Sequence, residues 1–97
     1  MITGNFKTYE LTILNGSHAE LDLHTVVSTE MLVKINPVAD EVRLLITPSS
    51  SSAIADAADF RLIDDSENEF ELGPGLDRLS FYNGSGGQVK VSIAVLF

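Results

Sequence analysis

The stretch Leu76–Phe97, LDRLSFYNGSGGQVKVSIAVLF, decides the fold class of this chain. Two runs of alternating apolar and polar residues flank the segment Asn83–Gly87, whose asparagine, glycine and serine residues are typical of a turn. In the second run, five apolar residues share one face of the predicted strand: Val89, Val91, Ile93, Val95 and Phe97. The stretch therefore predicts a terminal β-hairpin.

The second strand of this hairpin is long, apolar and almost uncharged. A strand of this kind on an open sheet edge invites aggregation, because its unpaired peptide groups can pair with another chain. We therefore predict that it lies centrally in a sheet, or at an edge that another subunit covers.

Shorter alternating runs follow one another along the rest of the chain, separated by turn residues roughly every ten positions. They predict six further strands, at residues 6–14, 19–27, 31–35, 41–47, 60–63 and 68–72. Together with the terminal pair, they predict an all-β fold of about eight short antiparallel strands, arranged as a β-sandwich or as a jelly-roll-like barrel.

Local signals refine this outline. The dipeptide Asn15-Gly16 favours a tight turn, so we expect the first two strands to pair with each other. Asn36-Pro37 predicts the end of the third strand, because proline cannot donate a hydrogen bond to a ladder. Residues 48–52 read as a loop, and the alanine-rich residues 53–59 predict at most one short helix.

The composition is that of a single globular domain spanning residues 1–97. The chain has no cysteine, which excludes a disulfide framework and fits a reducing compartment. The first residues lack the pattern of a secretory signal, and no apolar run reaches the roughly 20 residues of a membrane span. Fourteen acidic residues against six basic ones give a net charge of −8, which disfavours nucleic acid and membrane partners.

No motif typical of catalysis, cofactor binding or metal binding occurs in the sequence, and we predict a protein that is not an enzyme. His18 and His24 lack the spacing of a metal motif and are predicted to lie on the surface. No serine stands in the context of a nucleophile with its base.

The acidic segment between the fifth and sixth predicted strands has one feature of a calcium loop. Its residues Asp64, Ser66 and Asn68 place oxygen ligands at alternate positions. However, Glu69 and Gly75 stand where a calcium loop requires a glycine and an acidic residue. We therefore predict a solvated hairpin tip with no bound metal.

Some apolar residues fall on the predicted solvent side of their strands. Leu32 and Leu45 do so in mid-chain, where a covering helix or loop, or a subunit contact, would explain them. Leu96 and Phe97 leave more apolar surface at the end of the last strand than one small domain needs. Exposed apolar surface with a polar rim marks interaction sites, so we predict these residues, together with Tyr82, as interface candidates.

Three runs in the second half of the chain carry a resemblance: Asp59–Leu62, Glu71–Gly73 and Leu76–Gly87. They are similar to small all-β virion proteins of tailed bacteriophages, which end in a comparable hairpin. The resemblance implies a capsid decoration (cement) protein or another accessory head protein. It brings no catalytic or cofactor residues with it.

This resemblance implies a structural protein that binds and stabilises the capsid shell. Its implied partners are the major capsid protein and copies of itself, in a small homo-oligomer such as a trimer. The implied location is the outer capsid surface after synthesis in the host cytoplasm, and an acidic surface suits the exterior better than the DNA-lined interior. The alternative is a carbohydrate- or receptor-binding β-sandwich module that uses Tyr82 and the loop Asn83–Gly87.

Overall fold

The computed structural model describes residues 4–26, 30–38, 41–63 and 66–97. These residues form eight strands and no helix, which confirms the all-β prediction. The strands are β1 (Phe6–Ile13), β2 (His18–Asp22), β3 (Met31–Pro37), β4 (Val42–Thr47), β5 (Phe60–Arg61), β6 (Asn68–Leu72), β7 (Arg78–Asn83) and β8 (Val89–Leu96).

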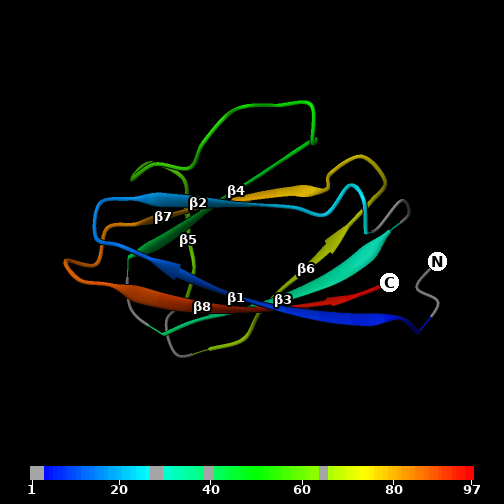
Figure 1. The fold of residues 1–97 in the computed structure, drawn as a ribbon, viewed down its shortest axis with the longest axis horizontal. Helices are drawn as coiled ribbons and strands as arrows, with labels where there is room; N and C mark the ends of the chain where they lie inside the picture. Colours follow the sequence, from blue (N-terminus) through cyan, green and yellow to red (C-terminus); the bar gives the residue numbers. More distant parts are fainter. Residues whose placement is uncertain (1–3, 27–29, 39–40, 64–65) are drawn as a thin grey trace.

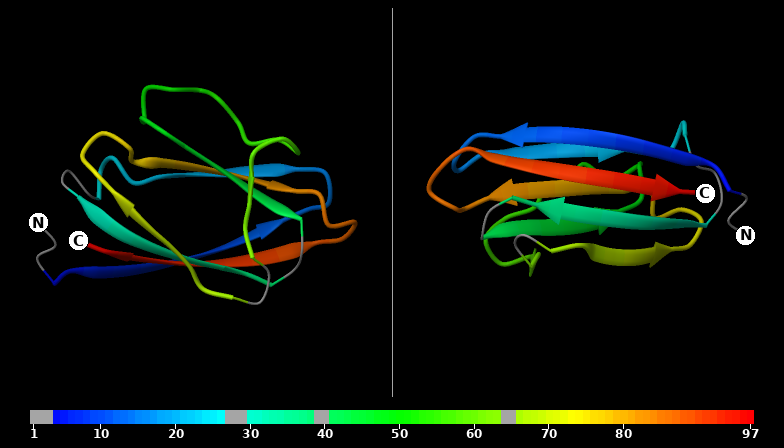
Figure 2. Two further views of the ribbon diagram at one scale, coloured as in Figure 1. Left: turned by 180° about the vertical axis from the view of Figure 1, so that it is seen from behind. Right: turned by 90° about the horizontal axis from the view of Figure 1, so that it is seen from below.

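The strands form two four-stranded antiparallel sheets that pack face to face. Sheet A has the order β1-β8-β3-β6, and sheet B has the order β2-β7-β4-β5. Figure 1 shows β2, β4 and β7 above β1, β3 and β8, and the right view of Figure 2 shows the strand order across each layer. Every connection except that from β4 to β5 crosses from one sheet to the other, which is a jelly roll.

Strand β8 lies inside sheet A, between β1 and β3, as its pattern predicts. Its four inward residues are fully or almost fully buried and form the middle of the core: Val89, Val91, Ile93 and Val95. The inward residues Leu79 and Phe81 of β7 are buried in the same core cluster from sheet B. The strict alternation of β8 follows from one face that packs on the core and one that faces solvent.

The predicted terminal hairpin is wrong, and so is the predicted pairing of the first two strands. β7 and β8 lie in different sheets, and β1 pairs with β8 whereas β2 pairs with β7. The turn residues reverse the chain as expected, but they do not decide in which sheet it continues. Crossing to the opposite sheet lets consecutive strands bury their apolar faces against each other.

The two Asn-Gly-Ser turns bond to each other at one end of the jelly roll. The Gly16 amide donates to the Asn83 carbonyl at 2.8 Å, and the Asn83 amide donates to the Ser17 carbonyl at 3.0 Å. The Gly86 amide donates to Asn15 Oδ1 at 3.0 Å. These bonds replace the hairpin ladders that the sequence pattern suggested.

The predicted end of the third strand at Asn36-Pro37 is wrong, because β3 continues through Pro37. The Val38 amide donates to the Lys90 carbonyl of β8, so the nitrogen of the preceding residue faces the other way, toward β6. The pairing with β6 ends at Ile35 opposite Asn68. Pro37 therefore lies where no partner needs an amide donor, and the ladder tolerates it.

Residues 48–59 cross the outer face of sheet B without forming a helix (Figure 1, green segment above β4). The Ala55 amide donates to the buried Ser80 Oγ of β7 at 2.8 Å. The Asp56 carboxylate accepts from the Ala58 amide at 2.8 Å, which is a local turn that competes with helix. Among the covering contacts, Arg78 of β7 donates to the Ala53 carbonyl.

Aromatic residues lie at the two open sides of the sandwich. On one side Phe60 of β5 meets Phe70 of β6 edge to face, with ring centroids 5.9 Å apart. On the other side Tyr9 of β1 packs against the core cluster. Phe70 and Tyr9 thereby extend the core toward the two sides of the sandwich.

Candidate interaction surface

The outer face of sheet A carries a row of apolar side chains. The registers place Phe6 of β1 opposite Leu96 of β8, Leu96 opposite Leu32 of β3, and Leu32 opposite Glu71 of β6. Leu32 and Leu96, two of the predicted interface candidates, are therefore direct neighbours and both are half-buried. We call Phe6, Leu96 and Leu32 the apolar row.

Phe6 was not among the predicted candidates, although its side chain is 63% exposed. The sequence held a signal for it. Phe6 has the same parity as the polar residues Thr8 and Glu10, which places all three on the solvent face of β1. An aromatic residue at a solvent-facing position should have been included in the candidate surface.

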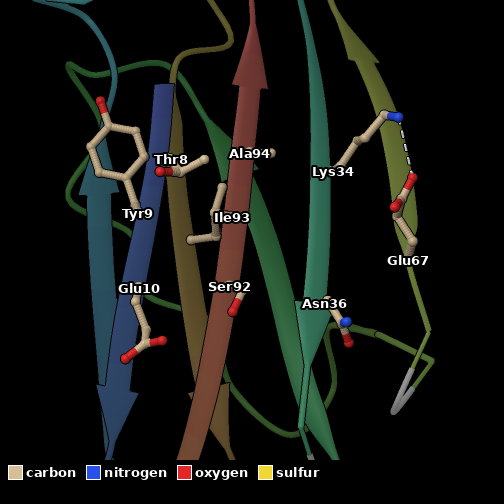
Figure 3. Close-up of a pocket in the computed structure, with 9 residues that line it drawn as sticks. All are labelled: Thr8, Tyr9, Glu10, Lys34, Asn36, Glu67, Ser92, Ile93 and Ala94. Atoms are coloured by element: carbon tan, nitrogen blue, oxygen red, sulfur yellow. Dashed lines mark ion pairs between the residues drawn. The ribbon is translucent and has the colours of Figure 1, made fainter. Parts of the chain in front are cut away.

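Next to the apolar row, the outer face of sheet A is hollowed into a depression of about 400 Å³ (Figure 3). Ser92 and Ala94 on the central strand β8 are small, whereas the strands on either side carry longer side chains, among them Glu10 and Lys34. A row of small residues between larger ones makes the face concave. The depression is lined by Thr8, Tyr9, Glu10, Lys34, Asn36, Glu67, Ser92, Ile93 and Ala94.

Charges at the far side of the depression are paired. Lys34 Nζ lies 3.3 Å from a carboxylate oxygen of Glu67 and 3.4 Å from one of Glu69. The hydrogen bonds to Glu67 and Glu69 raise the pKa of Lys34 above its ordinary value, so the lysine stays charged. Such exposed ion pairs add little to stability. Lys34 is the basic residue among the described residues that line the depression, and its charge is already paired.

The other three interface candidates lie elsewhere. Phe97 packs against the core cluster, and its backbone pairs with Asn5 through hydrogen bonds of 2.7 and 3.0 Å. Leu45 lies on the outer face of sheet B opposite Ser80, where residues 48–59 cross the sheet. The loop thus lies beside Leu45, as expected for one of the predicted reasons why this leucine faces outward.

Tyr82 lies on the outer face of sheet B, between His18 and Arg43 in the registers. The loop that follows it is closed by its own hydrogen bonds. The Asn83 side chain is buried and donates to the Ile13 and Gly87 carbonyls at 2.8 and 2.7 Å. The side-chain amide of Asn83 therefore stabilises the fold and does not point toward a ligand beside Tyr82.

Within the described residues, no group of three or more potential metal ligands comes together. His18 lies 3.2 Å from Glu20, and His24 lies 3.0 Å from Asp77, in separate places. For the calcium-like run, Asp64 lies outside the described residues, and Asn68 Oδ1 accepts from the Ile63 amide. The part of the chain that the structure describes contains no helix long and apolar enough to cross a membrane.

Asp77 forms a polar clamp that sequence reasoning missed. Its carboxylate accepts from the Ser49 amide at 2.8 Å and lies 3.0 Å from His24 Nδ1, and its carbonyl accepts from the Leu23 amide at 2.7 Å. It thus ties the end of β2 and the start of the covering segment to β7. No sequence spacing announces this contact, because Asp77 and His24 are 53 positions apart.

The clamp predicts a pH-dependent stability. Burial raises the pKa of Asp77, but the hydrogen bonds from His24, from the Ser49 amide and from its own amide outweigh burial and hold the pKa below its ordinary value of 3.8. A lowered folded-state pKa stabilises the fold above the unfolded-state pKa, and this contribution is lost as the pH falls through the folded-state pKa.

We therefore expect Asp77→Asn to lower the melting temperature at neutral pH. Its difference from the unaltered protein is expected to shrink between about pH 5 and pH 2. Thermal unfolding followed by circular dichroism across that range measures this. Glu71→Gln, a change at an exposed position on the outer face of sheet A, serves as the control. A difference for Asp77→Asn that is independent of pH would show that its carboxylate charge does not matter.

Comparison with known proteins identifies the fold. No protein-family model and no curated protein matches the chain. A de novo designed double-stranded β-helix matches 92% of this chain and 97% of its own, with a TM-score of 0.63 and 16% identity. A Cupin_2 domain of an XRE family transcriptional regulator from Enterobacter cloacae matches 95% and 81%, with a TM-score of 0.61 and 13% identity.

A chain from Bacillus endospore appendages, described as disulfide-linked pili, matches 99% of this chain and 87% of its own, with a TM-score of 0.61 and 8% identity. At identities this low, the likeness shows the fold alone. This chain folds as a double-stranded β-helix, in agreement with the jelly-roll order of its two sheets.

Proposed function

We propose that this protein is a structural component of a tailed-bacteriophage virion, of the capsid decoration or accessory head type. It binds the shell through the outer face of sheet A and carries out no chemistry. The observation that carries this proposal is the apolar row, because three neighbouring apolar side chains lie together on a solvent-facing sheet surface.

The surroundings of the apolar row support an interface. In the next register row Thr8 and Lys34 flank the small Ala94, and Glu71 borders the apolar row on β6. An apolar centre with a polar rim is the usual anatomy of a protein–protein contact. The depression next to the row offers a concave surface into which a side chain of the capsid protein would fit.

The charge of the protein supports an external position on the shell. With a net charge of −8, the protein repels packaged DNA, whose binding partners neutralise phosphates with lysine and arginine. The jelly roll is a scaffold used by viral capsid and lectin domains, which makes the fold compatible with this role without proving it. The resemblance of residues 59–87 to small virion proteins points the same way.

The experiment is co-sedimentation of the purified protein with expanded capsids of the phage whose genome carries the gene. Leu96→Ser is expected to weaken capsid binding on the order of tenfold or more, because it places a hydroxyl in the middle of the apolar row. Its cost in folding stability is expected to be only about 1 kcal/mol, because Leu96 is half-buried on the outer face.

Leu14→Ser is the matched control, because Leu14 is also exposed but follows the opposite end of β1. It is expected to leave capsid binding unchanged. Binding that is equally weakened by both changes, or no binding by a folded protein, would overturn the proposal. The neighbouring genes give a preliminary answer, since a decoration protein is expected beside genes for capsid, protease and portal proteins.

The alternative, a carbohydrate- or receptor-binding module at Tyr82 and residues 83–87, receives less support from the geometry. The side-chain amide of Asn83 donates its hydrogen bonds to backbone carbonyls, and Ser85 Oγ donates to the Gly87 carbonyl at 3.0 Å. Tyr82 is then left as the one large side chain of that loop. Recognition of a sugar ring normally combines stacking with several hydrogen-bonding groups.

A further inference from the structure

Strand β1 is an open edge of sheet A along its full length (Figure 2, right view). Asn5 and Phe97 exchange both of their backbone hydrogen bonds, so the odd-numbered residues of β1 bond to β8. The peptide groups of the alternate residues Phe6, Thr8, Glu10 and Thr12 therefore point away from β8. Within the described part of the chain, no residue bonds to them.

The other three sheet edges are shorter than β1, and two of them carry repeated acidic charge. The edge strand β6 carries Glu69 and Glu71, and β5 has only two residues. The edge strand β2 has five residues, among them Glu20 and Asp22. Short length and repeated charge are the usual means of preventing edge-to-edge pairing. β1 has eight residues and carries one lysine and one glutamate, so its own net charge is zero.

The same strand holds an unsatisfied polar group. The Tyr9 hydroxyl is the buried side-chain atom without a hydrogen-bond partner among the described residues. Buried polar groups are almost always paired, so this hydroxyl is an exception among the described side chains. Tyr9 stands at the middle of the four open peptide positions.

We propose that two copies of this chain pair through β1, antiparallel to each other, about a twofold axis at Tyr9. Phe6 of one copy then lies opposite Thr12 of the other, and Thr8 lies opposite Glu10. All four open residues of each strand are paired in this register, with two hydrogen bonds in each pair and about eight in total. The two copies of sheet A become one continuous sheet.

Charge and side-chain direction select this register over its neighbours. A shift by one residue places the core face of one strand beside the solvent face of the other. A shift by two residues in one direction places Glu10 opposite Glu10, two like charges. A shift by two in the other direction places Thr12 opposite Gly4, which lies outside the strand. In the proposed register, Lys7 lies opposite Leu11 and no like charges are opposed.

This contact closes with two copies, because the same edge is used by both. It therefore predicts a dimer in place of the trimer that the resemblance to virion proteins suggested. The inference does not rest on capsid binding. If the protein dimerises but does not bind capsids, only the proposed function fails.

The test is the mass of the full chain in solution, measured by sedimentation equilibrium over a range of concentrations. We expect a species of twice the chain mass of 10.5 kDa. Thr8→Pro is expected to raise the dimer dissociation constant on the order of a hundredfold, because it removes an outward amide donor from each copy. The ladder to β8 is retained, because the Thr8 amide does not take part in it.

Glu71→Pro is the matched control, since the Glu71 amide points outward from the opposite edge strand β6 in the same way. It is expected to leave the dimer intact. Hydrogen exchange supplies a second measurement: the amides of Phe6, Thr8, Glu10 and Thr12 should be protected at high protein concentration and exposed on dilution. A monomer at all concentrations, or a dimer that survives Thr8→Pro with these amides unprotected, would overturn the proposal.

Discussion

Asn83→Ala is expected to lower the free energy of unfolding by about 3–5 kcal/mol, because a buried side chain loses three hydrogen bonds at once. The Asn83 side chain donates to the Ile13 and Gly87 carbonyls and accepts from the Ser85 amide at 2.9 Å. The Ile13 carbonyl would be left unpaired in the interior, which costs more than the hydrogen bond itself is worth. In a domain of this size the melting temperature should fall by at least about 12 °C.

Asn15→Ala is the matched control for this prediction. Asn15 begins the other Asn-Gly-Ser turn, and its Oδ1 accepts from the Gly86 amide at 3.0 Å. Because Asn15 is exposed, water replaces the lost bond, and the expected cost is about 1 kcal/mol or less. Urea unfolding of both variants measures the difference. Equal costs would mean that the buried amide of Asn83 is not what holds this end of the jelly roll together.

Phe81→Ala is expected to cost about 3–5 kcal/mol, through lost apolar burial and the cavity that remains. Phe81 is fully buried at the centre of β7 and is one of the largest side chains in the core. Since a small domain has a total stability of only about 5–15 kcal/mol, this variant should lose a large share of its stability.

Tyr82→Ala, one position further along the same strand, provides the control. Tyr82 points to the outer face of sheet B and is half-buried, so its truncation is expected to cost about 1–2 kcal/mol. If the two variants unfold in urea with the same m-value, their midpoints give the ratio of the two losses in free energy of unfolding. Similar costs would contradict the assignment of the two faces of β7.

The covering segment 48–59 shows how an apolar outward residue can belong to the fold. Leu45 is opposite Ser80, and the Ala55 amide reaches Ser80 Oγ across the outer face of sheet B. No comparable segment of the described chain bonds across the apolar row on sheet A. Leu32 and Leu96 therefore stay available to a binding partner, whereas the covering segment lies beside Leu45.

The alternation of apolar residues determined which face of each strand packs on the core. For β8 it fixed the inward set from Val89 to Val95, and for β3 it placed Leu32 outside, as observed. Local turn chemistry determined where the chain reverses, at Asn15-Gly16 and at Asn83–Gly87. Both kinds of signal act over a few residues, which is why one sequence is enough to read them.

Only the tertiary structure decided which strands pair. A strand with one apolar face can bury that face from either sheet, and the turn residues fit a crossing between sheets as well as a hairpin. The local signals therefore did not reveal that β1 pairs with β8 and not with β2. The apolar row of Phe6, Leu96 and Leu32, the Asp77 clamp and the open edge of β1 all depend on that choice. They join residues far apart in the chain, through side-chain packing that no local pattern encodes.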